Sequence, residues 1–79
     1  MIRIVYTPHA RDQMASRRIA ESQVDRALAA PTRLYPNHSG RLVAERVTAM
    51  GNTLRVVDAE RVMATETILF VITVIRIGR

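Results

Sequence analysis

Cysteine, lysine and tryptophan are absent from this chain of 79 residues, and its aromatic side chains are two tyrosines and one phenylalanine. Without cysteine the chain forms no disulfide and no thiolate metal site, which agrees with a reducing cytoplasm. So few aromatic rings make a thin platform for stacking RNA bases. Tyr6 and Tyr35 are therefore assigned either to such stacking or to packing in the core or at a sheet edge.

Long apolar runs and clustered metal ligands are missing as well. The longest apolar run, Ile68 to Ile75, is far shorter than the roughly 20 residues of a membrane-spanning helix, and the N-terminus lacks the pattern of a signal peptide. The two histidines, His9 and His38, stand in no HExxH motif and beside no carboxylate cluster. We therefore predict no metal site, no cofactor, no Ser-His-Asp triad and no membrane partner.

Positive charge is in excess, since twelve arginines stand against seven acidic residues and give a formal net charge of +5. Guanidinium groups suit phosphates and carboxylates, which favours RNA, DNA or an acidic protein as partner. The alternative is that an arginine-rich composition reflects genomic base composition. The length predicts one small domain, residues 1–79, with a core that contributes only about 3–5 kcal/mol of net stability.

The pattern of apolar residues and breakers predicts an α+β domain in the order β-α-α-β-β-β. Two N-terminal helices are expected to pack on a small, mainly antiparallel, twisted sheet. Thr7 and Pro8 are typical of a helix start. The expected strands cover residues 2–6, 41–50, 53–57 and 67–77, the helices 8–18 and 21–30, an optional edge strand 32–35, and a loop or wide hairpin connection 58–66.

The last strand, residues 67–77, is apolar on both faces and is expected to lie centrally in the sheet. Simple alternation puts Val74 on the face of Ile68 and Val71 on the opposite face. Two short helices cover one face only. The other face is expected to be covered by a second copy of the chain or another protein, or else by curling of the sheet itself.

The first helix carries the residues best suited to chemistry. His9, Gln13 and Arg17 follow one another at intervals of four and share one helix face. An imidazole near a helix N-terminus, with Arg11 and Arg18 in the next turns, has the parts of a metal-independent ribonuclease: a general base for a ribose hydroxyl and cations for the phosphate. The alternative is that His9 is a structural histidine at the strand–helix junction.

Four further arginines fall on predicted strands, namely Arg41, Arg46, Arg55 and Arg76. If they project from one face of the sheet, they form a phosphate-binding surface. If they point to solvent separately, they are ordinary solubilising charges.

The run from His9 to Ile19, followed by a V-x-x-A-L helix and Pro31, resembles the domain of unknown function 4258 family. The opening motif of that family is roughly H-A-x-x-R-M-x-x-R-x-I, and the segments LRVVDAE and ITVIRI resemble its closing strands. Gln13 stands where the motif usually has arginine. The resemblance covers nearly the whole chain and implies a compact α+β domain similar to the RelE and BrnT toxins, which are small basic ribonucleases held inactive by an antitoxin.

By position, the resemblance assigns His9 as acid and base and Arg17 as a phosphate ligand, with Arg76 as the nearest C-terminal candidate. Arg11 and Arg18, with the arginines on the strands, would bind the RNA backbone. An acidic antitoxin-like protein would be the partner. The competing hypothesis is a non-catalytic protein-interaction module, in which His9 and Arg17 tie the first helix to the sheet.

Overall fold

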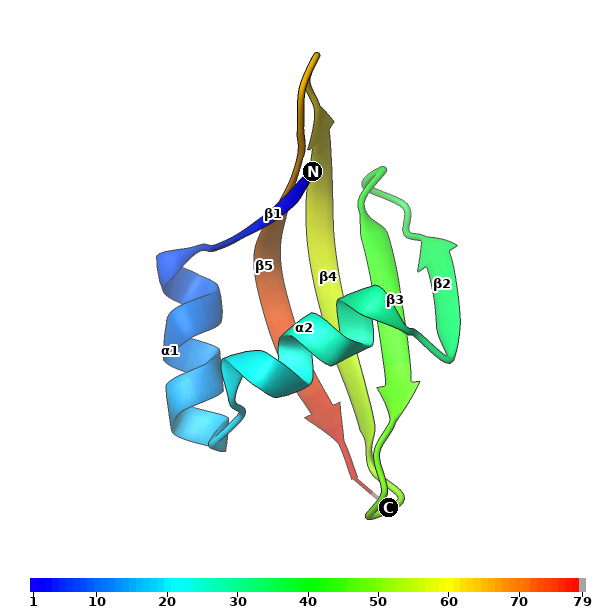
Figure 1. Ribbon diagram of the computed structural model, residues 1–79. Coiled ribbons are helices and arrows are strands. Elements are labelled where there is room, and N and C mark those ends of the chain that lie inside the picture. Colours follow the sequence, from blue (N-terminus) through cyan, green and yellow to red (C-terminus); the bar gives the residue numbers. More distant parts are fainter. Residues whose placement is uncertain (79) are drawn as a thin grey trace.

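The computed structural model describes residues 1–78 as a five-stranded sheet with two helices packed against it (Figure 1). The strand order in the sheet is β1-β5-β4-β3-β2. The chain is an α+β protein, as its sequence predicts. The elements are β1 (Ile2–Tyr6), α1 (Pro8–Arg17), α2 (Glu21–Ala29), β2 (Arg33–Pro36), β3 (Leu42–Val47), β4 (Thr53–Val62) and β5 (Thr67–Ile77).

The sheet is more mixed than the sequence analysis predicts. β1 runs parallel to β5, with Ile4 opposite Leu69, while the other neighbouring strands are antiparallel. The helices carry the chain from β1 at one edge to β2 at the other, and three hairpins then lead β5 back beside β1. The optional edge strand is real, because β2 pairs with β3, so four strands rather than three follow the helices.

The prediction of a loop or wide hairpin connection over residues 58–66 is wrong for residues 58–62, which belong to β4, and right for the turn that follows. β4 continues to Val62, and only a short turn, closed by a hydrogen bond from the Met63 N–H to the Glu66 carbonyl (2.8 Å), leads into β5. Asp58 and Glu60 have low strand propensity, but β5 offers them a continuous partner strand. Pairing with the long apolar strand β5 outweighs the low strand propensity of these two residues.

The start of α1 follows from local sequence. The hydroxyl of Thr7 accepts a hydrogen bond from the Ala10 N–H (3.2 Å) and donates one to the Val71 carbonyl (2.9 Å), so one side chain both caps α1 and anchors it to β5. The helix ends with Arg18 in the left-handed conformation (φ 55°) and a hydrogen bond from the Ile19 N–H to the Met14 carbonyl (2.8 Å). This is a Schellman-type end, and its apolar residue Ile19 turns into the core.

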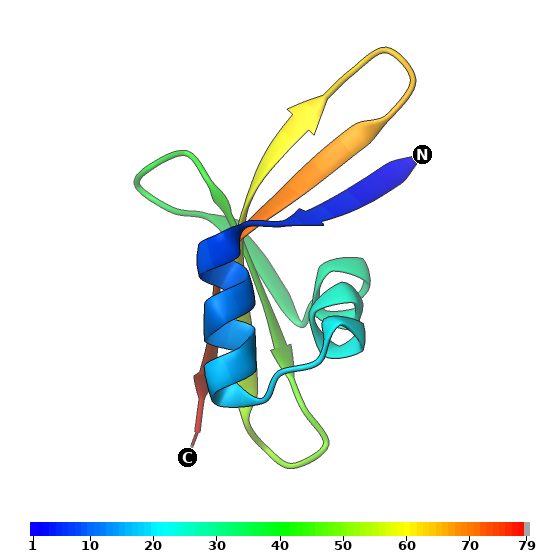
Figure 2. The same cartoon turned by 90° about the vertical axis from the view of Figure 1, so that its left-hand side faces the viewer.

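Both helices lie on one side of the sheet, α2 across β3 and β4 and α1 alongside β5 (Figures 1 and 2). The core between them contains Ala10, Met14, Ile19, Val24, Ala27, Leu54, Val56, Val71 and Val74. A β-bulge in β5, opposite the step from Val57 to Asp58, puts Val71 and Val74 in this same core. The simple alternation that predicts opposite faces for these two valines is therefore wrong.

The other face of the sheet carries no helix within residues 1–78. Val43 and Ile68 point to this face and are nevertheless only 4% and 6% exposed. The sheet is strongly twisted (Figure 2), which lets neighbouring side chains close over them. A second copy or another protein on this face stays a prediction. No helix among the described residues is long and apolar enough to cross a membrane.

Candidate nucleic-acid interface

The helix face that carries the predicted chemistry is fastened to the edge of β5. The Val74 N–H donates to the Gln13 side-chain oxygen (2.8 Å), and a guanidinium N–H of Arg17 donates to the Val74 carbonyl (3.3 Å). β1 pairs with β5 only as far as Val71, so beyond that point the backbone of β5 has no strand on this side. Gln13 and Arg17 replace the missing strand, and we call these two residues with Val74 the edge clasp.

Arg76 joins β5 to the end of the same helix. Its guanidinium donates to the carbonyl oxygens of Arg17 (3.0 Å) and Arg18 (3.4 Å), which belong to the C-terminal end of α1. The last carbonyls of a helix lack intrahelical partners and carry the negative end of its dipole, so a cation here is stabilising. The structure thus brings Arg17 and Arg76 together, but through backbone contacts.

His9 stands apart from this pair. Its imidazole is exposed at the first turn of α1 and forms no hydrogen bond or ion pair with any residue in the range 1–78. Arg11, on the same turn, forms an ion pair with Glu21 and lies over the ring of Tyr6, 4.6 Å from its centroid. Of the proposed catalytic residues, only Arg17 and Arg76 are close neighbours.

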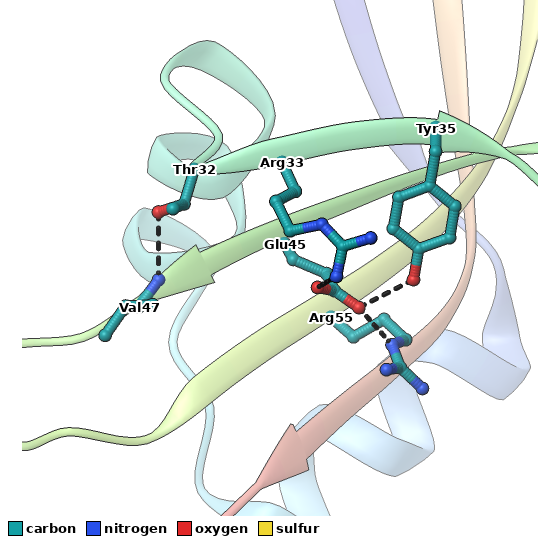
Figure 3. Close-up of polar contacts among 6 residues, drawn as sticks. All are labelled: Thr32, Arg33, Tyr35, Glu45, Val47 and Arg55. Carbon is teal, nitrogen blue, oxygen red and sulfur yellow. Dashed lines mark hydrogen bonds and ion pairs between the residues drawn. The ribbon is translucent and has the colours of Figure 1, made fainter.

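Arg55 lies in a network on the uncovered face of the sheet (Figure 3). The Glu45 carboxylate, whose side chain is 7% exposed, accepts hydrogen bonds from the Tyr35 hydroxyl (2.6 Å) and from Arg55 (2.7 Å) and forms an ion pair with Arg33 (3.6 Å). The bond from Tyr35, and then that from Arg55, lowers the pKa of Glu45, and the same Tyr35 bond raises the pKa of the tyrosine. Arg55 is committed to fixing the edge strand.

The four strand arginines therefore do not share one surface. Arg46 and Arg76 point to the helix side of the sheet and Arg55 to the opposite side. Arg41 is exposed just before β3, at the far end of that strand from the β3–β4 turn. Arg18 is exposed at the end of α1.

Three arginines line a groove on the helix side of the sheet. It is a hollow of about 580 Å³ between α2 and the β3–β4 turn, at the lower end of the sheet in Figure 1. Arg26 of α2, Arg46 of β3 and Arg76 of β5 line it, together with the polar side chains of Ser22 and Asn52. We call this hollow the basic groove. Its described lining includes no aspartate, glutamate or histidine.

The acidic residues of α2 are held away from the basic groove. Glu21 pairs with Arg11, and Asp25 accepts a hydrogen bond from the Tyr6 hydroxyl. Burial, and then this bond, raises the pKa of Tyr6 above its ordinary value. No carboxylate within residues 1–78 therefore neutralises Arg26.

The arginines of the basic groove keep donors for a ligand. Arg46 donates one hydrogen bond to the Ala30 carbonyl (2.6 Å), and Arg76 donates two to the end of α1. A guanidinium has five N–H donors in a planar fork, so most of them stay free. The guanidinium of Arg26 has no partner in the described part of the chain. The arrangement can therefore bind phosphate oxygens by paired hydrogen bonds.

Arg26 is the residue that sequence reasoning missed. Ser22, Gln23 and Arg26 have the helical spacing of one face, which was readable from the sequence. Nothing in the sequence showed that this face meets Arg46 and Arg76 across a hollow, because that depends on where α2 crosses the sheet.

A second buried carboxyl, besides Glu45, lies outside the basic groove. Asp58 is 3% exposed on the helix side of β4, and its Oδ1 atom has no hydrogen-bond partner among residues 1–78. Burial, and then the negative charge of Glu60, raises the pKa of Asp58 to about 6. No group of three histidine, cysteine or acidic side chains that could hold a metal ion is found in this part of the chain.

Fold and site define a small α+β protein with an arginine-lined groove beside its second helix. The family described as domain of unknown function (DUF4258) matches residues 6–76, and the chain belongs to this family. This confirms the family resemblance seen in the run from His9 to Ile19. No similar chain is found among curated proteins or among solved structures. The likeness to RelE and BrnT toxins stays a proposal.

Proposed function

We propose that this protein binds single-stranded RNA through the basic groove, on an α+β fold similar to that of the RelE and BrnT toxins. The observation that carries the proposal is the convergence of Arg26, Arg46 and Arg76 on one hollow without a neighbouring carboxylate. Positive charge with free donors is what the RNA backbone requires. The net charge of +5 adds a long-range attraction for any polyanion.

The size of the basic groove favours a single strand. Its volume of about 580 Å³ falls within the range of roughly 300–1,000 Å³ that is usual for small-ligand pockets. A duplex presents a wide, rigid surface and is recognised along its grooves, whereas a single strand can place one unit after another into a pocket.

Cleavage of RNA without a metal is the second candidate, and one observation favours it. His9 is exposed and unbonded within residues 1–78, so its imidazole is available as an acid or base. Its expected partners are engaged elsewhere, since Arg17 holds Val74 and Arg76 holds the end of α1. The described lining of the basic groove supplies no carboxylate or imidazole as acid or base. Binding without cleavage is therefore the better-supported function, and the protein is then an interaction module whose partner is RNA.

Fluorescence anisotropy with a labelled single-stranded RNA of about 12 nucleotides, a usual site size for such binders, tests the proposal. Replacing Arg26 with glutamine (R26Q) should weaken binding about tenfold and reduce the slope of log affinity against log salt by about one. The matched control is R61Q, which removes the same charge from an exposed position near the far end of β4. If R26Q and R61Q lose the same RNA affinity, the attraction is non-specific and the proposal is wrong.

Incubation of the same RNA with the protein in chelator tests the second candidate. Cleavage that disappears in a folded H9A variant, and persists in the matched H38A variant, would assign chemistry to His9. Absence of cleavage, together with RNA binding that depends on Arg26, is the result that we expect.

A further inference from the structure

The basic groove has an apolar wall that phosphate binding does not use. Val47, Ala49 and Met50, at the end of β3 and in the turn that follows it, line the hollow on the side opposite α2, and we call them the apolar lip. Val47 is 52% exposed and Met50 is 86% exposed. Large apolar side chains at such exposure, beside three arginines, are suited to a ligand that is charged at one end and flat and apolar at the other.

Resting on the proposed function, we infer that the basic groove binds RNA one nucleotide at a time. Its arginines take the phosphate, and the apolar lip takes the face of the base. The thioether of Met50 and the guanidinium of Arg26 both make favourable contacts with aromatic faces. Bases bound in this way are recognised with little preference for sequence, because every base has such a face.

The backbone of the turn holds the apolar lip in place. The Thr48 N–H donates to the Asn52 carbonyl (2.7 Å), and the Gly51 N–H donates to the Thr48 carbonyl (3.0 Å). Gly51 has a φ of 84°, a conformation that glycine adopts without strain. Met50 is thus presented by a closed turn and not by a free loop.

Polar groups in the same wall suit the sugar or the edge of a base. Asn52, on the same turn, offers both a donor and an acceptor. A phosphate alone would leave the lip and these groups unused, whereas a nucleotide has parts for each of them.

An acidic peptide is the competing occupant, because it also combines negative and apolar groups. A stable protein interface extends over roughly 800 Å² on each partner, whereas the arginines and the apolar lip line one hollow of about 580 Å³, a volume usual for small-ligand pockets. A nucleotide unit suits the size of the hollow better, and we commit to it.

The test measures binding of two probes, single-stranded RNA of about 12 nucleotides and inorganic polyphosphate of equal charge, which has no bases. M50S should weaken RNA binding about two- to tenfold, in line with the strength of sulfur–aromatic contacts, and should leave polyphosphate binding unchanged. The matched control is M63S, an exposed methionine in the β4–β5 turn, which should alter neither. The exposure of Met50 means that the variant folds, which circular dichroism verifies.

The variants separate this inference from the proposed function. If M50S weakens both probes equally or neither, the apolar lip does not bind bases and the inference fails. The proposed function survives that result as long as R26Q weakens both probes more than R61Q does. If R26Q has no such effect, both fail. Tighter binding of an acidic peptide of equal charge than of RNA would overturn the nucleotide assignment.

Discussion

The two helices use their polar side chains in opposite ways. On α1, Gln13 and Arg17 bond to the backbone of Val74 and complete the edge of the sheet. On α2, Arg26 faces a hollow and has no partner among residues 1–78. The edge clasp therefore fastens α1 to the sheet, and the basic groove is the surface that we propose for binding. An exposed arginine can serve the fold as well as a ligand, and unpaired backbone carbonyls near it decide which of the two it does.

The difference arises from the lengths of the strands beneath the helices. β1 has 5 residues and β5 has 11, so β5 outruns its neighbour and exposes backbone N–H and C=O groups next to α1. Such groups are costly when buried without partners. α2 instead crosses β4, which pairs with β3 and β5 from Thr53 to Asp58, and β3, which pairs with β2 as far as Glu45. Beyond Glu45, the N–H of Val47 donates to the Thr32 hydroxyl (3.2 Å). No backbone group there requires Arg26, and its charge remains available for a ligand.

The largest predicted effect that separates the two regions concerns pH and Asp58, a buried carboxyl on the helix side of the sheet. Its pKa of about 6, against an ordinary 3.8, means that the folded state holds the proton more tightly. The stability from this group is full below the ordinary value and is lost as pH rises through about 6. The loss should be about 2 kcal/mol between about pH 4.5 and about pH 7.5.

Urea unfolding at several pH values measures this loss. D58N should flatten the dependence, and D12N, an exposed control on α1, should leave it unchanged. RNA affinity should stay constant over the same range while the protein is folded, because the described lining of the basic groove has no acidic residue or histidine. An affinity that falls with the stability would mean that the groove depends on Asp58.

The second prediction targets the edge clasp. Q13A leaves the N–H of Val74 without its partner and should destabilise the protein by about 1–2 kcal/mol. The corresponding loss is roughly 4–8 °C of melting temperature per kcal/mol for a domain of this size. RNA affinity should not change. Q13E keeps an acceptor oxygen and should retain most of the stability, whereas D12A controls for helix propensity. If Q13A is as stable as the parent protein, the edge clasp does not stabilise the fold.

The clasp also shows how far sequence reasoning reaches. Thr7 and Pro8 act locally, and the start of α1 is where they predict it. The lengths of the first and last strands were predicted as well. Their parallel pairing was not, and without it no one could foresee that Gln13 and Arg17 would face an open strand edge. In this structure Arg17 contacts the backbone of Val74, and its expected phosphate contact stays a prediction.

The second half of β4 and the bulge in β5 were not predicted from the sequence for the same reason. Asp58 and Glu60 read as loop residues, and only pairing with β5 makes them strand. The bulge moves Val74 to the side of Val71, which no periodicity of two residues can express. Effects that depend on a neighbouring strand are invisible in the order of residues along one strand.

Arg76 belongs both to the attachment of α1 and to the basic groove. R76Q removes two hydrogen bonds to the end of α1, which should destabilise the protein by about 1 kcal/mol. It also removes one cation of the basic groove, so RNA affinity should fall about tenfold. Thermal unfolding and anisotropy on the same preparations measure both losses, with R61Q as the matched charge control. A loss in only one of the two would assign Arg76 to that region alone.

The smallest predicted effect is the coupling between the regions, measured by double-mutant cycles of unfolding. Gln13 and Arg26 share no partner among residues 1–78, so the effects of Q13A and R26Q on stability should add within about 0.5 kcal/mol. Q13A and R76Q should not add, because both loosen the attachment of α1 to β5 and the second change acts on a helix that is already freed. If Q13A and R26Q were coupled as strongly as Q13A and R76Q, the edge clasp and the basic groove would not be independent. The edge clasp would then help to hold the groove open.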